Sequence, residues 1–262
     1  MEFNIVLSSH QNRSGRSTVA KILSKLLHMP KTSGGDMHRL FALEYFKGFD
    51  RGQLVKEFIE NQDLAAIFEK YGNISSEEYV EFHEHVVKQD PFYDHQIDEY
   101  LIKCLMKKGW IIDSVIGVSM IHYLTDNTTK LNEYFLISGK ITLEDAKNIQ
   151  KDTETVYFLA DIDIRAKRSA SYEESFGHET SVANEKTLLL ERQNENEQRY
   201  QEIYGFKNSE GQNLAKLVVD SSVMNPIEIA TEIVSKSDKI QSRLKELGIA
   251  DYKAAISEIA DW

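Results

Sequence analysis

Residues 3–18 read FNIVLSSHQNRSGRST, and this stretch decides the fold that the 262-residue chain predicts. The run Phe3–Leu7 is apolar and too short for a globular helix, so we expect a buried strand. A loop of small and polar residues follows, and after it apolar residues recur on one face of a helix. That face consists of Val19, Ile22, Leu23, Leu26 and Leu27.

A strand, a small-residue loop and a helix start are the parts of an anion-binding loop, where backbone N–H groups and the helix dipole point at the anion. The usual pattern is G-x-x-x-x-G-K-[ST], and here Gly15 and Ser17 match it. His10 stands at the first glycine and Arg16 at the lysine, so an ordinary strand-to-helix turn is an equal alternative. We expect the donor phosphates to be bound by His10, Arg13, Ser14, Gly15, Arg16, Ser17 and Thr18.

Three further apolar runs predict strands at Trp110–Ile112, Val156–Leu159 and Leu217–Val219. Helical periodicity lies between them, and Asn225 followed by Pro226 predicts an N-cap and first helical position. Strands that alternate with helices favour crossover units and a parallel sheet. We therefore expect an α/β fold of three layers.

Two regions are helical in pattern but very polar, at about 44–92 and 165–208. Such excursions from a sheet are often mobile covers of an active site, although solvated surface helices are an equal alternative. The last stretch, from about residue 235 to 262, predicts an amphipathic helical tail.

Composition limits the function classes. The chain has 31 Lys and Arg against 42 Asp and Glu, and a net charge of −11, which argues against a nucleic-acid partner. The single cysteine, Cys104, allows no internal disulfide and suits a cytoplasmic location. No run approaches the roughly 18 apolar residues that a membrane span needs, so we expect no membrane association.

Five later segments extend the pattern: Ser33-Gly34-Gly35-Asp36-Met37-His38-Arg39; Asp94 to Asp98, with Asp113 after the next strand; Val156 to Asp161 with Arg165-Ala166-Lys167-Arg168; Arg192 with Arg199-Tyr200-Gln201-Glu202-Ile203-Tyr204-Gly205; and Val218 to Ser222 with Pro226-Ile227-Glu228. In this order they resemble motifs of the cytidylate kinases, especially the short archaeal-type members. The most specific piece is R-Y-x-x-x-Y-G. The resemblance covers roughly residues 3–234, with extra length at about 65–90 and 116–150.

The resemblance implies a P-loop NTPase fold in a kinase-like domain at 1–234, with an NMP-binding excursion at about 36–92 and a lid at about 165–208. It implies transfer of the γ-phosphoryl group of ATP, with Mg²⁺, to a small nucleotide, CMP or dCMP. The resemblance implies that catalysis is carried by Arg16, Asp113, Arg192 and Arg199. It implies that the substrate is bound by Ser33, Gly35, Asp36, Arg39 and Arg168. It also implies that Mg²⁺ is held by the Ser17 hydroxyl and, through water, by Asp113.

Four positions depart from the family pattern. Besides His10 and Arg16, Val115 stands where an arginine that contacts the acceptor is expected, and Tyr172 replaces the last lid arginine. Loss of a cation that stabilises a phosphoryl transition state typically costs orders of magnitude in rate. Arg13 is a candidate for the replacement charge.

Three hypotheses follow. The chain is a diverged but active nucleoside monophosphate kinase, or a pseudokinase that binds a nucleotide as a sensor or interaction module. The third is another P-loop transferase, because Arg13-Ser14-Gly15-x-Ser17 resembles the R-S-G-T-S loop of sulfotransferases. Arg192 and Arg199, two helical turns apart, serve the lid in the first hypothesis, whereas a solvated helix would pair them with Glu195 and Glu202.

Overall fold

The computed structural model describes residues 2–61, 64–87, 89–90, 92–175 and 177–260. Its centre is a five-stranded parallel sheet in the order β2-β3-β1-β4-β5. The strands are β1 (Asn4–Ser8), β2 (Lys31–Ser33), β3 (Ile111–Ser114), β4 (Thr153–Leu159) and β5 (Leu217–Asp220). The predicted α/β class with a parallel sheet is confirmed.

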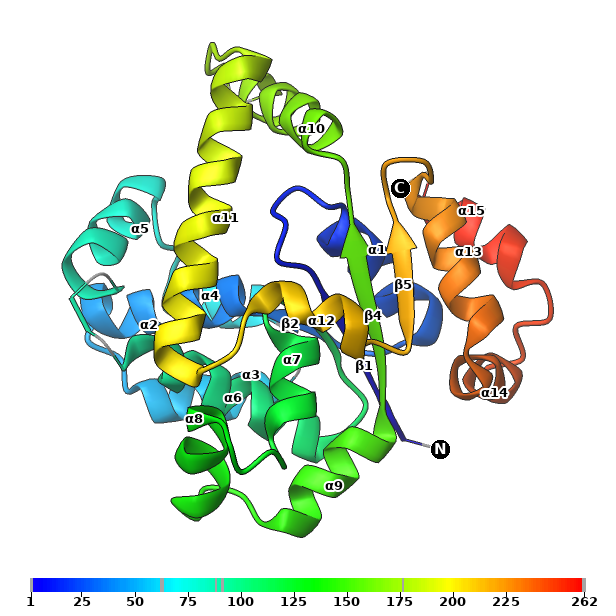
Figure 1. Ribbon diagram of the computed structural model, residues 1–262, viewed down its shortest axis with the longest axis horizontal. Helices are drawn as coiled ribbons and strands as arrows, with labels where there is room; N and C mark the ends of the chain where they lie inside the picture. Colours follow the sequence, from blue (N-terminus) through cyan, green and yellow to red (C-terminus); the bar gives the residue numbers. More distant parts are fainter. Residues whose placement is uncertain (1, 62–63, 88, 91, 176, 261–262) are drawn as a thin grey trace.

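Helices cover both faces of the sheet (Figure 1). Those up to β4 are α1 (Arg16–Leu27), α2 (Gly34–Lys47), α3 (Arg51–Asn61), α4 (Leu64–Tyr71), α5 (Ser76–Phe82), η1 (His83–Val87), α6 (Tyr93–Lys107), α7 (Gly117–Tyr123), α8 (Lys130–Asn132), η2 (Glu133–Ile137) and α9 (Leu143–Asp152). Those after it are α10 (Ile162–Ser175), α11 (Val182–Tyr204), η3 (Asn208–Glu210), α12 (Gly211–Leu214), α13 (Pro226–Lys236), α14 (Asp238–Glu246) and α15 (Tyr252–Ala260).

The three layers follow from the period of two along each strand. On β1, Ile5 and Leu7 point into one core, which α1 and α13 to α15 complete. Val6, between them, points into the other core, which α2, α6, α7 and α9 share. All three side chains are fully buried, as expected for a central strand covered on both faces.

The sequence pattern predicts β1, β3, β4 and β5 but misses β2. Its residues, Lys31-Thr32-Ser33, are polar and form an edge strand that pairs with β3 alone, so no apolar run marks it. Strand β4 starts earlier than expected, at Thr153. Its first residues are polar, yet they pair with β1, and Thr153 lies opposite Asn4. The predicted cap of α13 is confirmed: Asn225 accepts from the backbone N–H groups of Ile227 and Glu228.

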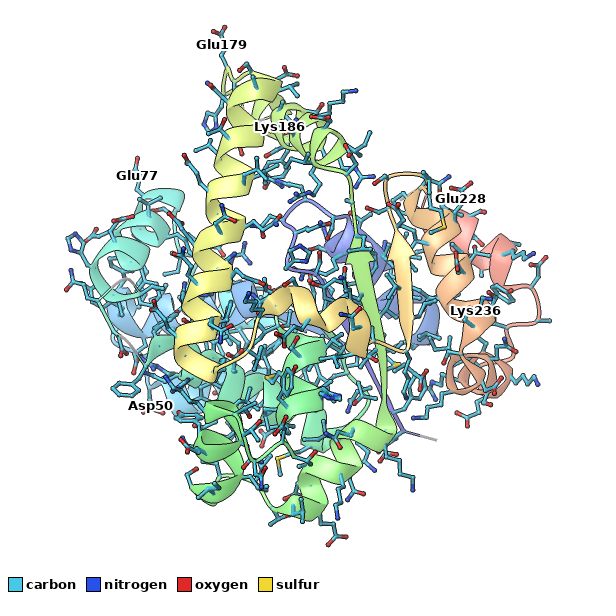
Figure 2. The ribbon with its side chains drawn as sticks, in the orientation of Figure 1. Asp50, Glu77, Glu179, Lys186, Glu228 and Lys236 are labelled. Carbon is cyan, nitrogen blue, oxygen red and sulfur yellow. The ribbon has the colours of Figure 1, made fainter. Side chains whose placement is uncertain are left out.

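Helices α10 and α11 form a hairpin that projects beyond the carboxyl ends of the strands (Figure 1). It occupies the region predicted as a lid. Glu179 and Lys186 lie at its outer end (Figure 2), and Glu185 holds the hairpin together by accepting from Ser169 and Thr180. The region predicted as an NMP-binding excursion is helical, from α2 to η1.

The C-terminal helices pack against α1 and α13 and complete the second core. Ile240, Leu244 and Ile256 are at most 3% exposed there. In the described part of the chain, no helix is both long enough and apolar enough to cross a membrane.

Ile256→Ala is expected to lower the free energy of unfolding by about 2–5 kcal/mol, because it leaves a cavity between α15 and the rest of its core. Urea denaturation measures this change. Val223→Ala, at a side chain that is 78% exposed, serves as the control and should cost less than about 0.5 kcal/mol. Equal midpoints for the two variants would show that the C-terminal helices do not stabilise the fold.

Candidate functional site

The loop between β1 and α1 has the backbone of an anion cradle. Gly15, at the N-cap of α1, has φ 84°, and Arg13 has φ 63°, so two residues take the left-handed conformation within three positions. No side chain caps the first turn of α1. Its backbone N–H groups therefore point toward the loop, where an anion can accept from them.

Ser17 and Asp113 meet beside this loop, as the sequence predicts for a magnesium site. The pairing of β1 with β3 places Asp113 opposite Leu7, the second-last residue of β1. The Ser17 hydroxyl donates to Asp113 Oδ2 over 2.5 Å. One carboxylate and one hydroxyl suit Mg²⁺, which keeps several waters and phosphate oxygens as its other ligands. No cluster of three or more His, Cys, Asp or Glu suited to a metal occurs among the described residues.

Arg16 points beneath the loop. Its Nε lies 2.6 Å from Asp113 Oδ1, and its Nη1 donates to the carbonyl oxygens of Ser9 (3.0 Å) and Ser114 (2.9 Å). The side chain is only 13% exposed. In this arrangement Arg16 ties the loop to the end of β3, and its guanidinium is already engaged by one ion pair and two hydrogen bonds.

His10 is an anchor of the loop. Tyr157 on β4 has its hydroxyl 2.6 Å from His10 Nδ1 and accepts from the His10 backbone N–H over 3.1 Å. Burial lowers the pKa of His10, while the charges of Glu197 and Arg165 act on it in opposite directions. The ring therefore fills the place of the expected glycine by packing against the sheet.

Arg165 belongs to the R-A-x-R segment, but the resemblance assigns it no role. It is the most deeply buried arginine of the site. It is 2% exposed and donates to Gln193 Oε1 over 3.1 Å. Its Nε and Nη1 have no hydrogen-bond partner among the described residues, and burial lowers its pKa although Asp161 opposes this. A buried guanidinium with unsatisfied N–H groups is costly unless an anion accepts from them.

Arg168, the other arginine of the R-A-x-R segment, connects α10 to the loop between β1 and α1. It donates to the Ser221 backbone oxygen (2.6 Å), the Ser221 hydroxyl (3.1 Å) and the Arg13 backbone oxygen (3.4 Å). Its Nη1 also lies over Gly15. The structure thus places Arg168 beside the donor loop.

The four expected substrate residues of α2 lie together at its N-terminus. Ser33 caps the helix and donates to Asp36, while Asp36 also faces Lys31 (3.8 Å) and Arg39 (3.4 Å). Gly35 lies between the Ser33 hydroxyl and the Arg39 guanidinium. Arg39 remains 52% exposed, which leaves its fork accessible to a ligand.

Arg192 of α11 and Arg39 of α2 both lie near Tyr79. Burial raises the pKa of Tyr79, and the positive charges of Arg39 and Arg192 both lower it, so the two cations lie near one hydroxyl. Two guanidinium groups from separate helices can together bind one phosphate.

The two helical motifs of the resemblance contact each other. Arg199 pairs with Asp94 through two bonds, of which Nε to Oδ2 is 2.5 Å. Tyr204 donates to Asp98 over 2.7 Å. The solvated-helix alternative, with Glu202 as the partner of Arg199, is wrong because Asp94 takes that place.

Asp98 is a buried carboxyl beside Asp94. Burial, and then the neighbouring charge of Asp94, raise its pKa to about 8. Burial raises the pKa of Tyr200; the carboxyls of Asp94 and Asp98 raise it further, while Arg199 and Arg16 lower it.

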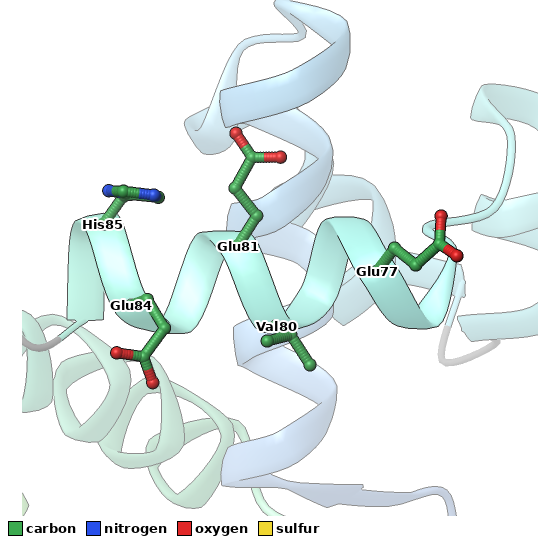
Figure 3. Close-up of a pocket in the computed structure, with 5 residues that line it drawn as sticks. All are labelled: Glu77, Val80, Glu81, Glu84 and His85. Carbon is green, nitrogen blue, oxygen red and sulfur yellow. The ribbon is translucent and has the colours of Figure 1, made fainter.

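Most predicted residues converge on the carboxyl ends of the strands, where ligands bind in open α/β sheets. Ser14 is 2% exposed, so its side chain is part of the packing, whereas Ser17 and Thr18 are exposed at the start of α1. A separate surface hollow of about 530 Å³ lies on α5 and η1, lined by Glu77, Val80, Glu81, Glu84 and His85 (Figure 3). It shares no residue with the site.

No family model and no curated protein sequence matches the chain. Solved structures resemble it distantly. An uncharacterized protein from Eubacterium ventriosum is 12% identical, with a TM-score of 0.45 over 92% of this chain and 99% of that one. A gluconokinase from Sinorhizobium meliloti is 11% identical, with a TM-score of 0.43 over 94% of this chain and 97% of that one. The shikimate kinase from Acinetobacter baumannii, in complex with shikimate, is 14% identical, with a TM-score of 0.39 over 90% of this chain and 92% of that one.

The chain has a three-layer α/β fold, with a parallel sheet in the order β2-β3-β1-β4-β5 and an anion cradle in the loop between β1 and α1. The chain is distantly similar in structure to small P-loop kinases, and at these identities the likeness says nothing of its substrate.

Asp98→Asn is expected to change the pH dependence of stability. With a pKa of about 8 in the folded protein and roughly 3.9 in the unfolded chain, wild-type Asp98 holds a proton that the unfolded chain has lost. The wild type therefore loses stability as the pH rises from about 5 to 8, and Asp98→Asn lacks this loss.

Urea unfolding at several pH values measures the effect, with the exposed Glu60→Gln as control. The stability of Asp98→Asn relative to the wild type should rise with pH, whereas parallel curves would contradict the assignment.

Proposed function

We propose that the chain transfers the γ-phosphoryl group of ATP to a nucleoside monophosphate, CMP or dCMP. The observation that carries this proposal is Arg165: a buried guanidinium with unsatisfied N–H groups, on the same helix as Arg168, which donates to the Arg13 backbone oxygen of the loop. Such a group fits the oxygens of a polyphosphate, the ligand that the loop backbone itself suits.

On the donor side, the loop N–H groups would hold the phosphates, with Arg168 beside Gly15 and Arg165 one helical turn before Arg168 on α10. Ser17 and Asp113 would hold Mg²⁺. Bound ATP supplies the phosphoryl group, and the chain's own part is to position the reactants and neutralise charge.

On the acceptor side, Arg39 and Arg192 suit the phosphate of a nucleoside monophosphate. The Asp94–Arg199 pair lies two helical turns beyond Arg192 on α11, and the buried Asp98 carboxyl adjoins it. A cytosine edge presents an amino donor together with ring acceptors, and a carboxylate beside a guanidinium complements both. This chemistry supports CMP or dCMP over uracil, which lacks the amino donor.

A second candidate, nucleotide binding without turnover, is favoured by Arg16. Its guanidinium is held by Asp113 and two backbone oxygens. If it stays there when ATP binds, the loop lacks the cation that a P-loop lysine brings to the phosphates. The chain would then act as a nucleotide sensor.

ADP formation from Mg²⁺-ATP tests the two candidates, with CMP, dCMP, UMP, AMP and GMP offered separately. Turnover with CMP or dCMP is the expected result. ATP binding without turnover, at an enzyme concentration that would reveal a thousandfold-impaired kinase, would favour the sensor. Absence of both would overturn the proposal.

Arg165→Met is expected to weaken ATP binding at least about tenfold while leaving the thermal midpoint of the ligand-free protein unchanged or higher. The reason is that an apolar side chain of similar volume removes an uncompensated buried charge. Calorimetric titration and thermal unfolding measure the two effects. Arg243→Met, at a half-exposed position on α14, is the control, and unchanged ATP affinity in Arg165→Met would contradict the donor role.

A further inference from the structure

Arg13 stands in the middle of the loop, held by the first helix of the lid. Its φ of 63° places it in the left-handed region, which non-glycine residues adopt when surrounding contacts hold them there. Arg168, on α10, donates to its backbone oxygen. The backbone conformation of the loop is thus linked to α10.

Two neighbouring residues of α10 hold the side chain of Arg13. Its guanidinium carbon lies 3.8 Å from the centroid of the Tyr172 ring, and its Nη2 lies 3.6 Å from Glu173 Oε1. The flat ring supports one face of the guanidinium, and the carboxylate forms a long ion pair with one of its terminal nitrogens.

The Arg13–Glu173 pair is one that a ligand can exchange. The two side chains are 33% and 31% exposed, so water reaches both, and an ion pair of this kind is weak. A guanidinium has five N–H donors, and the contact with Glu173 uses one edge of the fork. By contrast, Arg16 is engaged beneath the loop by its ion pair with Asp113 and by hydrogen bonds to two backbone oxygens. Arg13 is therefore the loop arginine placed on the lid side, beside the N-terminus of α1.

We propose that Arg13 is a ligand of the donor polyphosphate, that Tyr172 positions it, and that Glu173 competes with the phosphate for it. This inference rests on the proposed nucleotide binding and deepens it. When the donor binds, the Arg13 guanidinium exchanges Glu173 for phosphate oxygens while it stays on the Tyr172 ring. Donor binding at the loop is thereby coupled to the position of α10.

Calorimetric titration with ATP tests the sign of the Glu173 effect. Arg13→Ala should weaken ATP binding about tenfold. Glu173→Gln should tighten it several-fold, since Arg13 no longer has a competing carboxylate. The double variant should bind ATP as Arg13→Ala does. Glu174→Gln, at the next position on α10, is the matched control for the removed charge and should change little.

Two further measurements are the ATP affinity of Tyr172 variants and the affinity of all variants for a ligand that lacks phosphates. Tyr172→Phe should keep wild-type ATP affinity and Tyr172→Leu should lose several-fold, because only the first keeps a ring under the guanidinium. Adenosine, which lacks phosphates, should bind all variants equally. Arg13→Lys keeps the charge, and circular dichroism with urea unfolding checks that each variant folds.

The outcomes are distinct. If the Arg13–Glu173 pair is only structural, Glu173→Gln will weaken ATP binding or leave it unchanged, which overturns the inference. Equal ATP affinity in Arg13→Ala and wild type overturns it as well and leaves the proposed function standing. If the wild type binds ATP with the predicted variant effects but phosphorylates no acceptor, the inference holds and the kinase proposal fails. Absence of ATP binding by the wild type overturns both.

Discussion

Strand β1 pairs in parallel with β3 on one side and β4 on the other, and this double pairing determines where the functional side chains lie. The register that sets Leu7 opposite both Asp113 and Val156 brings the carboxyl ends of β1 and β3 level, while β4 continues two residues further, to Leu159. Asp113 then meets Ser17 and Arg16, and Tyr157 reaches His10. A slip of one residue would turn each of these side chains to the opposite face.

The site concentrates positive charge in a chain whose net charge is −11. Its arginines come from the loop, from α2 and from α10 and α11. They differ in how fully acidic or polar partners satisfy their guanidinium groups. Arg199 has a bidentate carboxylate partner, Arg13 a half-exposed one, and Arg165 has Gln193 as its single acceptor in the described structure. This gradation separates arginines that stabilise the fold from those available to a phosphate ligand.

The sequence predicts the sheet and the loop because buried strands, caps and small-residue loops leave local patterns. It misses β2, whose edge position allows the polar run Lys31-Thr32-Ser33. It also misses what the departures from the P-loop pattern do, because these depend on contacts between distant segments. His10 packs on Tyr157, 147 residues away, and Tyr172 stacks on Arg13. Arg165 was visible in the R-A-x-R motif, but its burial was not.

A crystal structure with Mg²⁺, a non-hydrolysable ATP analogue and CMP tests the central claim, that this arginine-rich site binds both nucleotides for phosphoryl transfer. The account predicts the triphosphate in the loop at residues 8–18, with Nε and Nη1 of Arg165 donating to its oxygens. It predicts Mg²⁺ beside Ser17 and Asp113, and the cytosine edge against Asp94 and Arg199. A triphosphate bound elsewhere, or Arg165 still without an acceptor in the filled site, would contradict the account.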